Sequence, residues 1–279
     1  MTEQASIAIT PTVKIAGDSE AGPEHIGVRG LTIGYGSRVI LRDLNFSVGR
    51  GDIFIVMGPS GCGKSTLLNA MVGLTEPLSG DVFYGEVNFT RADPEERRRL
   101  RQSVGVLFQS GALWSSMTLA ENVGLPLGEF TRLRPAEIRK VAFAKLAMVG
   151  LRGFEDYYPA NVSGGMRSRA ALARAMALDP EILFFDEPTA ALDPLSARRL
   201  DDLMLELRDS LGATFVVVTH DLRTIFRVGT NSIFLDPESR TIIAGGKPKH
   251  LRAECPDPRV RLFLSSSDGE DQSTRSSYA

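Results

Sequence analysis

The fold of this chain is decided by nine residues, Gly58-Pro59-Ser60-Gly61-Cys62-Gly63-Lys64-Ser65-Thr66, which match the phosphate-loop pattern G-x-x-x-x-G-K-[ST]. They follow the apolar run Ile53–Met57 and open a predicted helix from Lys64 to about Val72. Glycines let backbone N–H groups curl around phosphate oxygens, Lys64 adds a positive charge, and Ser65 offers a hydroxyl to Mg²⁺. We therefore predict that these nine residues bind nucleotide phosphates at the positive end of the helix dipole.

Two further apolar runs end in residues that suit hydrolysis of a nucleotide. Ile182–Phe185 leads to Asp186 and Glu187, and Phe215–Val218 leads to His220. Runs that are apolar on both faces favour buried parallel strands, whose carboxyl ends bind ligands. Alternation sends the two acids in different directions, so we predict that Asp186 contacts Mg²⁺ and that Glu187 is the general base on the attacking water. His220 is a candidate partner for a terminal phosphate. On these residues alone, solvated acids and a structural histidine remain alternatives.

The composition is that of a globular protein with its own hydrophobic core. The 279 residues are 43% hydrophobic and 24% charged, and 32 Lys and Arg face 34 Asp and Glu, for a net charge of −2. A near-neutral chain argues against a dedicated nucleic-acid-binding protein. The two cysteines, Cys62 and Cys255, are too few for a disulfide framework or a structural zinc site. No apolar run reaches the roughly 18 residues that span a bilayer, so a membrane role is expected to come through a partner.

Apolar strands that alternate with helical patterns predict an α/β fold. Between the core strands, the periodicity of Pro135–Val149 predicts an amphipathic helix, which Gly150 is placed to end. The expected parts are a flexible N-terminal arm (1–24), a nucleotide-binding core (25–109 and 181–250), a helical subdomain (110–180), and a C-terminal extension with a disordered tail from Ser265 (251–279).

A second anion site is predicted within the helical subdomain. Ser163 suits a helix N-cap, and Gly164 and Gly165 let another backbone approach the helix start closely. The helix that follows would direct its positive end at an anion. The alternative interpretation is a capped helix with a basic, solvated face.

With these motifs in this order, residues 25–250 resemble the ATP-binding cassette of ABC transporters. The phosphate loop resembles the Walker A motif, Leu183–Glu187 the Walker B motif with its catalytic glutamate, and Ser163–Met166 the signature that usually reads LSGGQ. The other family motifs are matched by Tyr35 (the aromatic residue that stacks on adenine), Gln109 (the Q-loop), Ala191-Leu192-Asp193 (the D-loop) and His220 (the switch histidine). The resemblance implies a P-loop NTPase fold with a RecA-like parallel-sheet core, an antiparallel β edge and a helical subdomain.

The resemblance also implies how ATP is bound. Two cassettes are expected to form a head-to-tail homodimer that holds each ATP between the Walker A motif of one chain and the signature of the other. Gln109 is expected to contact Mg²⁺ and water, and to face the membrane partner. Because Lys64, Glu187 and His220 are all present, we expect hydrolysis of ATP to ADP and phosphate rather than a degenerate regulatory cassette. The signature residues expected to contact the ATP of the other chain are Ser163, Gly164 and Gly165, and Asp193 is a further residue expected to bind the nucleotide.

Several features resemble the ATPases of MCE-linked lipid transporters more narrowly. Met166 replaces the usual Gln of the signature and Val162 the usual Leu, and Gly105–Leu113, Asn122–Leu127 and Asp257–Leu264 also resemble that group. This implies a phospholipid or another lipid as cargo, with a multispanning permease and a periplasmic MCE-domain protein as partners. It also implies attachment to the cytoplasmic face of the inner membrane. In some members a small STAS-domain protein regulates the ATPase, and it is a further expected partner.

Other classes remain as alternatives to lipid transport. An importer of amino acids or other solutes would use the same motifs, because nothing in a cassette binds the cargo. A soluble ABC ATPase acting on DNA or ribosomes would carry two cassettes or a long coiled-coil insertion, and neither is present in this sequence. A phosphate-loop kinase or GTPase has no use for the Ser163–Met166 segment or for His220 in this order.

Overall fold

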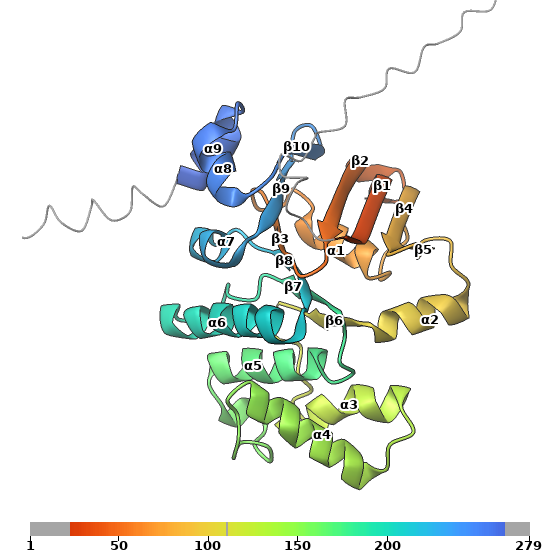
Figure 1. Ribbon diagram of the computed structural model, residues 1–279, viewed down its shortest axis with the longest axis vertical. Helices are drawn as coiled ribbons and strands as arrows, with labels where there is room; N and C mark the ends of the chain where they lie inside the picture. The colour runs from red at the N-terminus through yellow and green to blue at the C-terminus, as the bar shows by residue number, and fades with distance from the viewer. Residues whose placement is uncertain (1–22, 110, 266–279) are drawn as a thin grey trace, which may run out of the picture.

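A computed structural model describes residues 23–109 and 111–265, which form two β-sheets with helices around them (Figure 1). The larger sheet has the order β10-β9-β3-β8-β7-β6. All its paired strands run parallel except β9 and β10. Its strands are β3 (Ile53–Met57), β6 (Val104–Leu107), β7 (Ile182–Asp186), β8 (Thr214–Val218), β9 (Asn231–Asp236) and β10 (Thr241–Gly245). The predicted α/β fold with a parallel-sheet core is confirmed.

The second sheet is antiparallel and has the order β2-β1-β4-β5. β1 and β2 form a long hairpin in which Tyr35 pairs with Arg38, and Gly36 in the turn has a φ of +57°. This sheet is the antiparallel β edge that the resemblance implied. Its strands are β1 (Glu24–Tyr35), β2 (Arg38–Gly49), β4 (Ser79–Tyr84) and β5 (Val87–Asn88).

Helices lie on both sides of the parallel sheet, and those between residues 119 and 211 build the lower part of the molecule in Figure 1. They are α1 (Lys64–Met71), α2 (Pro94–Gln102), α3 (Leu119–Phe130), α4 (Pro135–Met148), α5 (Gly164–Ala175), α6 (Pro194–Leu211), α7 (Leu222–Val228), α8 (Pro248–Glu254) and α9 (Pro258–Ser265), with a 3₁₀ turn at Pro159–Asn161. α3, α4 and α5 pack on one another as a helical unit. The helix predicted over Pro135–Val149 is observed as α4, and Gly150 follows it with a φ of +70°.

Every residue of β3, β7 and β8 is buried, because hydrophobic cores lie on both faces of the sheet. Side chains alternate along a strand, so Ile53 and Ile55 join the core that contains α3 to α6. Phe54 and Val56 join the other core, with α1, β1 and β2. This double burial explains the uninterrupted apolar runs in the sequence.

Some expected boundaries differ from the observed ones. β1 already begins at Glu24, and residues 1–22 of the expected arm lie outside the described residues. The boundary expected at residue 250 falls inside α8. Ser265 ends α9 instead of opening a tail, because Val260 and Leu264 anchor that helix in the core; residues 266–279 are not among those described. Within the described part of the chain, no helix has the length and apolar character needed to cross a membrane.

His25 links the two sheets at the edge where β8 begins. Its Nδ1 lies 2.8 Å from Oγ1 of Thr214, and that oxygen accepts a hydrogen bond from the Gly51 N–H at 2.9 Å. Its Nε2 lies 3.3 Å from the Glu181 carboxylate. Burial, together with the charge of Arg50, holds the pKa of His25 below its ordinary value, although Glu181 opposes the shift. The neutral ring, accepting from Thr214 and donating to Glu181, satisfies this arrangement.

We expect His25 to make the protein less stable in mild acid. Its pKa is lower in the folded chain, so its contribution is complete above the unfolded-state pKa of about 6.5 and is lost as the pH falls through the folded-state value. Urea unfolding from about pH 7.5 to about pH 5 should show a steeper loss of unfolding free energy in wild type than in His25→Asn, by at most about 1.4 kcal/mol per pH unit. The exposed His250 provides the control, since His250→Asn should keep the wild-type slope. Equal slopes for wild type and His25→Asn would refute this role.

Candidate functional site

The phosphate loop connects β3 to α1, and its glycines adopt conformations that other residues rarely take. The φ angle is +149° at Gly58, +79° at Gly61 and +101° at Gly63. A Cβ atom at Gly58 would lie 2.5 Å from the carbonyl oxygen of Leu235, and one at Gly63 would lie 3.0 Å from the Leu41 side chain. The glycines that the motif requires are therefore also required by the shape of the loop.

The ammonium group of Lys64 lies against the loop that precedes it. Lys64 is only 6% exposed, and its Nζ donates to the carbonyl oxygens of Gly58 at 2.9 Å and Pro59 at 3.2 Å. No side chain caps the start of α1, so the N–H groups of its first turn are available to an anion. Burial raises the pKa of Cys62, which packs as a small neutral side chain rather than as a thiolate nucleophile.

Ser65 and Asp186 form a candidate Mg²⁺ site. The Ser65 hydroxyl donates to Oδ1 of Asp186 at 2.8 Å. Burial raises the pKa of Asp186 and the charge of Glu187 adds to the shift, while the bond from Ser65 and the charge of Lys64 oppose it. In the described ranges no three His, Cys, Asp or Glu side chains gather into a metal site of their own. The pair nevertheless fits Mg²⁺, which is held by one or two protein oxygens while phosphates and waters complete its shell.

Glu187 has a strained backbone and lies beside His220. Its φ angle is +47°, and its N–H donates to the Val218 carbonyl at 2.8 Å. Its Oε1 is 2.7 Å from Nδ1 of His220, whereas its buried Oε2 has no hydrogen-bond partner among the residues described. Buried carboxylate oxygens rarely lack a partner, so this one marks a place for a water molecule or a substrate atom. The structure brings together the two side chains predicted as general base and switch histidine; their roles stay predictions.

The signature and D-loop residues meet where α5 and α6 begin. Ser163 caps α5 by accepting a hydrogen bond from the Met166 N–H at 3.2 Å. Asp193 caps α6 by accepting hydrogen bonds from two N–H groups of its first turn, at 3.1 and 3.0 Å. A Cβ atom at Gly165 would lie 2.4 Å from Oγ of Ser196, so glycine allows the two helix starts to touch.

Other predicted residues are not brought together within one chain. α5 belongs to the hydrophobic core on one face of the parallel sheet and α1 to the core on the other, and Figure 1 shows α5 below α6, away from α1. The signature residues Ser163, Gly164 and Gly165 therefore do not surround a nucleotide together with the phosphate loop of the same chain. Tyr35 is 57% exposed, and the exposed Gln109 forms no hydrogen bond with the described residues.

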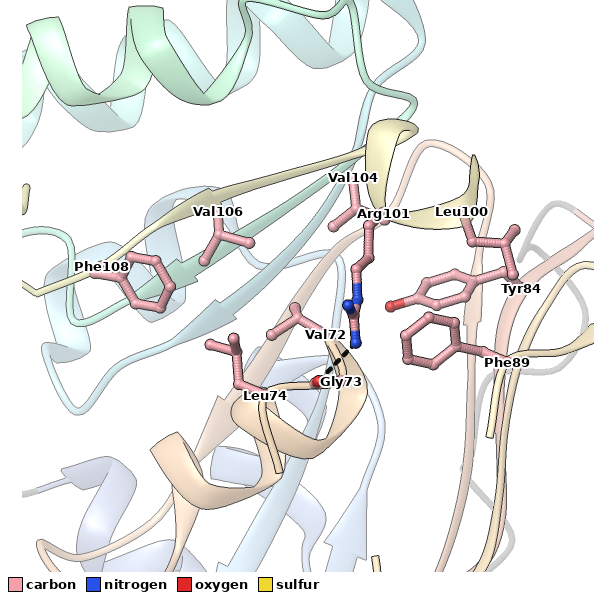
Figure 2. Close-up of a pocket in the computed structure, with 10 residues that line it drawn as sticks. All are labelled: Val72, Gly73, Leu74, Tyr84, Phe89, Leu100, Arg101, Val104, Val106 and Phe108. Carbon is pink, nitrogen blue, oxygen red and sulfur yellow. Dashed lines mark hydrogen bonds between the residues drawn. The ribbon is translucent and has the colours of Figure 1, made fainter. Parts of the chain in front are cut away.

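An apolar groove along the edge strand β6 has no counterpart among the sequence motifs (Figure 2). A cavity of about 230 Å³ lies between the end of α1, α2 and β6, where Arg101 donates to the Gly73 carbonyl at 3.0 Å. A second cavity of about 390 Å³ continues toward α3 and α5, and we call the two together the β6 groove. The residues that line both cavities are Arg101, Val104, Val106 and Phe108.

Known proteins are similar to this chain in sequence and in fold. A family model described as ABC transporter matches residues 41–190. The intermembrane phospholipid transport system ATP-binding protein MlaF of Escherichia coli K12 is 38% identical over 239 residues, which cover 86% of this chain and 88% of that protein. The probable ribonucleotide transport ATP-binding protein mkl of Mycobacterium tuberculosis is 37% identical over 86% of this chain; the matched segment spans 66% of that protein, about two thirds of its length. A dimeric structure of the ATP-binding cassette MJ0796 bound to ADP and phosphate gives a TM-score of 0.72 at 33% identity, covering 80% of this chain and 98% of that one.

We expect Glu187→Gln to stop catalysis while nucleotide binding persists. The amide cannot accept a proton from water, yet it keeps the size of the side chain and can still contact His220. In a steady-state ATPase assay kcat should fall by about 100-fold or more, while the affinity for a fluorescent ATP analogue stays close to wild type. Glu206→Gln, which changes an exposed glutamate on α6, should leave kcat unaltered. Wild-type turnover in Glu187→Gln would exclude it as the base.

Proposed function

The chain belongs to the ABC transporter family, and from this premise we propose that it is the ATP-hydrolysing subunit of a membrane transporter that carries phospholipid across the bacterial envelope. The observation that carries the proposal is the convergence of Lys64, the Ser65–Asp186 pair and the Glu187–His220 pair at the carboxyl ends of β3, β7 and β8. This arrangement serves hydrolysis of ATP to ADP and phosphate.

Each group has a separate task in that reaction. The loop N–H groups and Lys64 hold the phosphates, the ammonium turning from the loop carbonyls toward them. Ser65 and Asp186 would hold Mg²⁺, which would supply positive charge to offset the charge that develops on the departing ADP. Glu187 orients the attacking water and takes its proton through the unpartnered Oε2, while His220 fixes Oε1.

A second copy of the chain completes each ATP site. The start of α5, with Ser163 at its cap, is a further anion-binding helix end that the same chain's phosphate loop does not share. In a head-to-tail homodimer, the phosphate loop of one chain and the start of α5 of the other bind the same ATP. The similarity to a cassette solved as a dimer with ADP and phosphate supports this arrangement. Asp193, beside the signature, would then lie at the dimer contact.

The β6 groove offers a docking site for a multispanning permease. Leu125 and Phe130, on α3, are 40% and 42% exposed beside the groove, and Leu74 is 62% exposed at its other end. Gln109 directly follows Phe108, so a protein bound there would lie close to the Q-loop. We place the chain peripherally, at the cytoplasmic face of the inner membrane.

The similarity to MlaF and the segments around Met166 favour phospholipid as cargo, an MCE-domain protein as a further partner, and a STAS-domain protein as a regulator. Mkl is described as a ribonucleotide transport protein. A direct analysis of what accompanies this chain distinguishes the two kinds of cargo.

Purification of the tagged full-length chain from its native membranes in mild detergent tests partners and cargo together. We expect mass spectrometry to find a permease, an MCE-domain protein and phospholipid enriched over a detergent blank. Leu125→Glu places a charge in the β6 groove and should lose the permease, whereas Leu211→Glu, at a side chain that is 59% exposed on α6, should retain it. A permease recovered with a solute-binding protein would exclude lipid cargo. A chain recovered without any membrane protein would exclude the transport function.

A further inference from the structure

Arg174 makes a contact that none of the family motifs accounts for. From the last turn of α5, its guanidinium donates to the carbonyl oxygens of Gly111 at 2.8 Å and of Ala112 at 2.7 Å. These two residues come shortly after Gln109 in the chain. Across residues 23–109 and 111–265, no carboxylate forms an ion pair with Arg174. Burial lowers its pKa.

A partly buried guanidinium without a carboxylate partner needs other groups to compensate its charge. The two carbonyls do this, and the negative end of the α5 dipole adds to it. The planar guanidinium can donate to two adjacent carbonyls at once, whereas an ammonium group acts as a single point charge. The contact therefore depends on arginine specifically.

Packing also holds Gly111 and Ala112 against α5. Gly111 and Ala112 have φ angles of +76° and +45°, which bend the chain sharply at this point. A Cβ atom at Gly111 would lie 3.1 Å from Cβ of Ala171 on α5, so the backbone approaches the helix closely. Together with the two hydrogen bonds from Arg174, this contact fixes Gly111 and Ala112 to α5.

The same helix connects three parts of the proposed mechanism. α5 begins at the Ser163 cap and reaches Arg174 about 16 Å further along, at 1.5 Å per residue. Arg174 also lines the β6 groove near Leu125 and Phe108. Arg174 therefore lies between the surface proposed to dock the permease and the pair Gly111 and Ala112.

We propose that Arg174 is a positioning residue for ATP hydrolysis, which fixes Gly111 and Ala112, shortly after Gln109 in the chain, to the signature helix. Through this contact, the position of α5 limits how far Gln109 can lie from the Ser65–Asp186 pair. Gln109 lies two positions before Gly111 and forms no hydrogen bond with the described residues, so the anchored Gly111 limits where Gln109 can reach. This inference rests on the proposed function.

Arg174→Lys tests the inference in the purified transporter, because it keeps the positive charge and removes the bidentate contact with the carbonyls of Gly111 and Ala112. We expect kcat to fall about tenfold, or about 1.4 kcal/mol in the barrier. KM for ATP should stay within about twofold, and the Mg²⁺ concentration for half-maximal activity should rise. In a Gln109→Ala background the same substitution should change kcat by less than about twofold, because its effect passes through Gln109. Arg174→Gln should repeat the pattern if Arg174→Lys folds poorly by thermal melting.

Arg169→Lys is the matched control. Arg169 lies on the same helix, and its Nη1 donates to the carbonyls of Val149 at 2.9 Å and Gly150 at 3.1 Å, away from the Q-loop. This variant should lower Tm but keep the wild-type kcat and Mg²⁺ dependence. Equal kinetic effects of the two lysine variants, or independent effects of Arg174→Lys and Gln109→Ala, would overturn the inference. If the wild-type transporter has no ATPase activity, both the proposed function and the inference are wrong. If the wild-type transporter is active and Arg174→Lys has the same kinetics, the inference alone is wrong.

Discussion

The site depends on one constraint, the parallel order β3-β8-β7 at the centre of the sheet. Because β3 and β7 both pair with β8 in the same direction, the three strands deliver the residues that follow them to one edge. Ser65 and Asp186 are 121 residues apart in the sequence, yet they lie 2.8 Å from one another. The rest of the chemistry, including the contact between Glu187 and His220, depends on the same alignment.

Two neighbouring acids gain different environments from this geometry. Asp186 ends β7 and points to Ser65, where burial favours a bound cation to compensate its charge. Glu187, one residue later, has left the strand with a positive φ and points to His220. Strand alternation predicts that the two carboxylates diverge. It does not predict the strained backbone at Glu187, which depends on the hydrogen bond of its N–H to Val218 on the next strand.

The parts of the molecule that could be predicted are those whose cause is local in sequence. The phosphate loop, the three central strands and α4 each combine an apolar pattern with glycines or polar residues at their ends. α2 was missed because its nine residues, PEERRRLRQ, contain one apolar side chain, so there is no periodicity to detect. Its start was nevertheless signalled by Asp93, which caps the helix immediately before Pro94.

Features that arise from long-range contacts gave no sequence signal. The β6 groove draws its lining from the turn after α1 and from β4, α2, β6, α3 and α5, whose residues are scattered over about a hundred positions. The bond from Arg174 to the carbonyl of Gly111 spans 63 residues. The roles predicted for Gln109 and Tyr35 depend on groups outside this chain, because both are exposed.

Mixing two inactive variants tests most directly whether an ATP site is shared by two chains. Lys64→Ala disables the phosphate loop of one chain. Gly164→Glu disables the signature of the other, and a Cβ atom there meets nothing closer than 3.7 Å, so the fold is retained. In a mixed dimer, one of the two sites consists of wild-type halves. Random exchange of subunits makes about half of the dimers mixed, so ATPase activity should return to about a quarter of the wild-type rate. If each chain built its whole site alone, the mixture would remain as inactive as either variant.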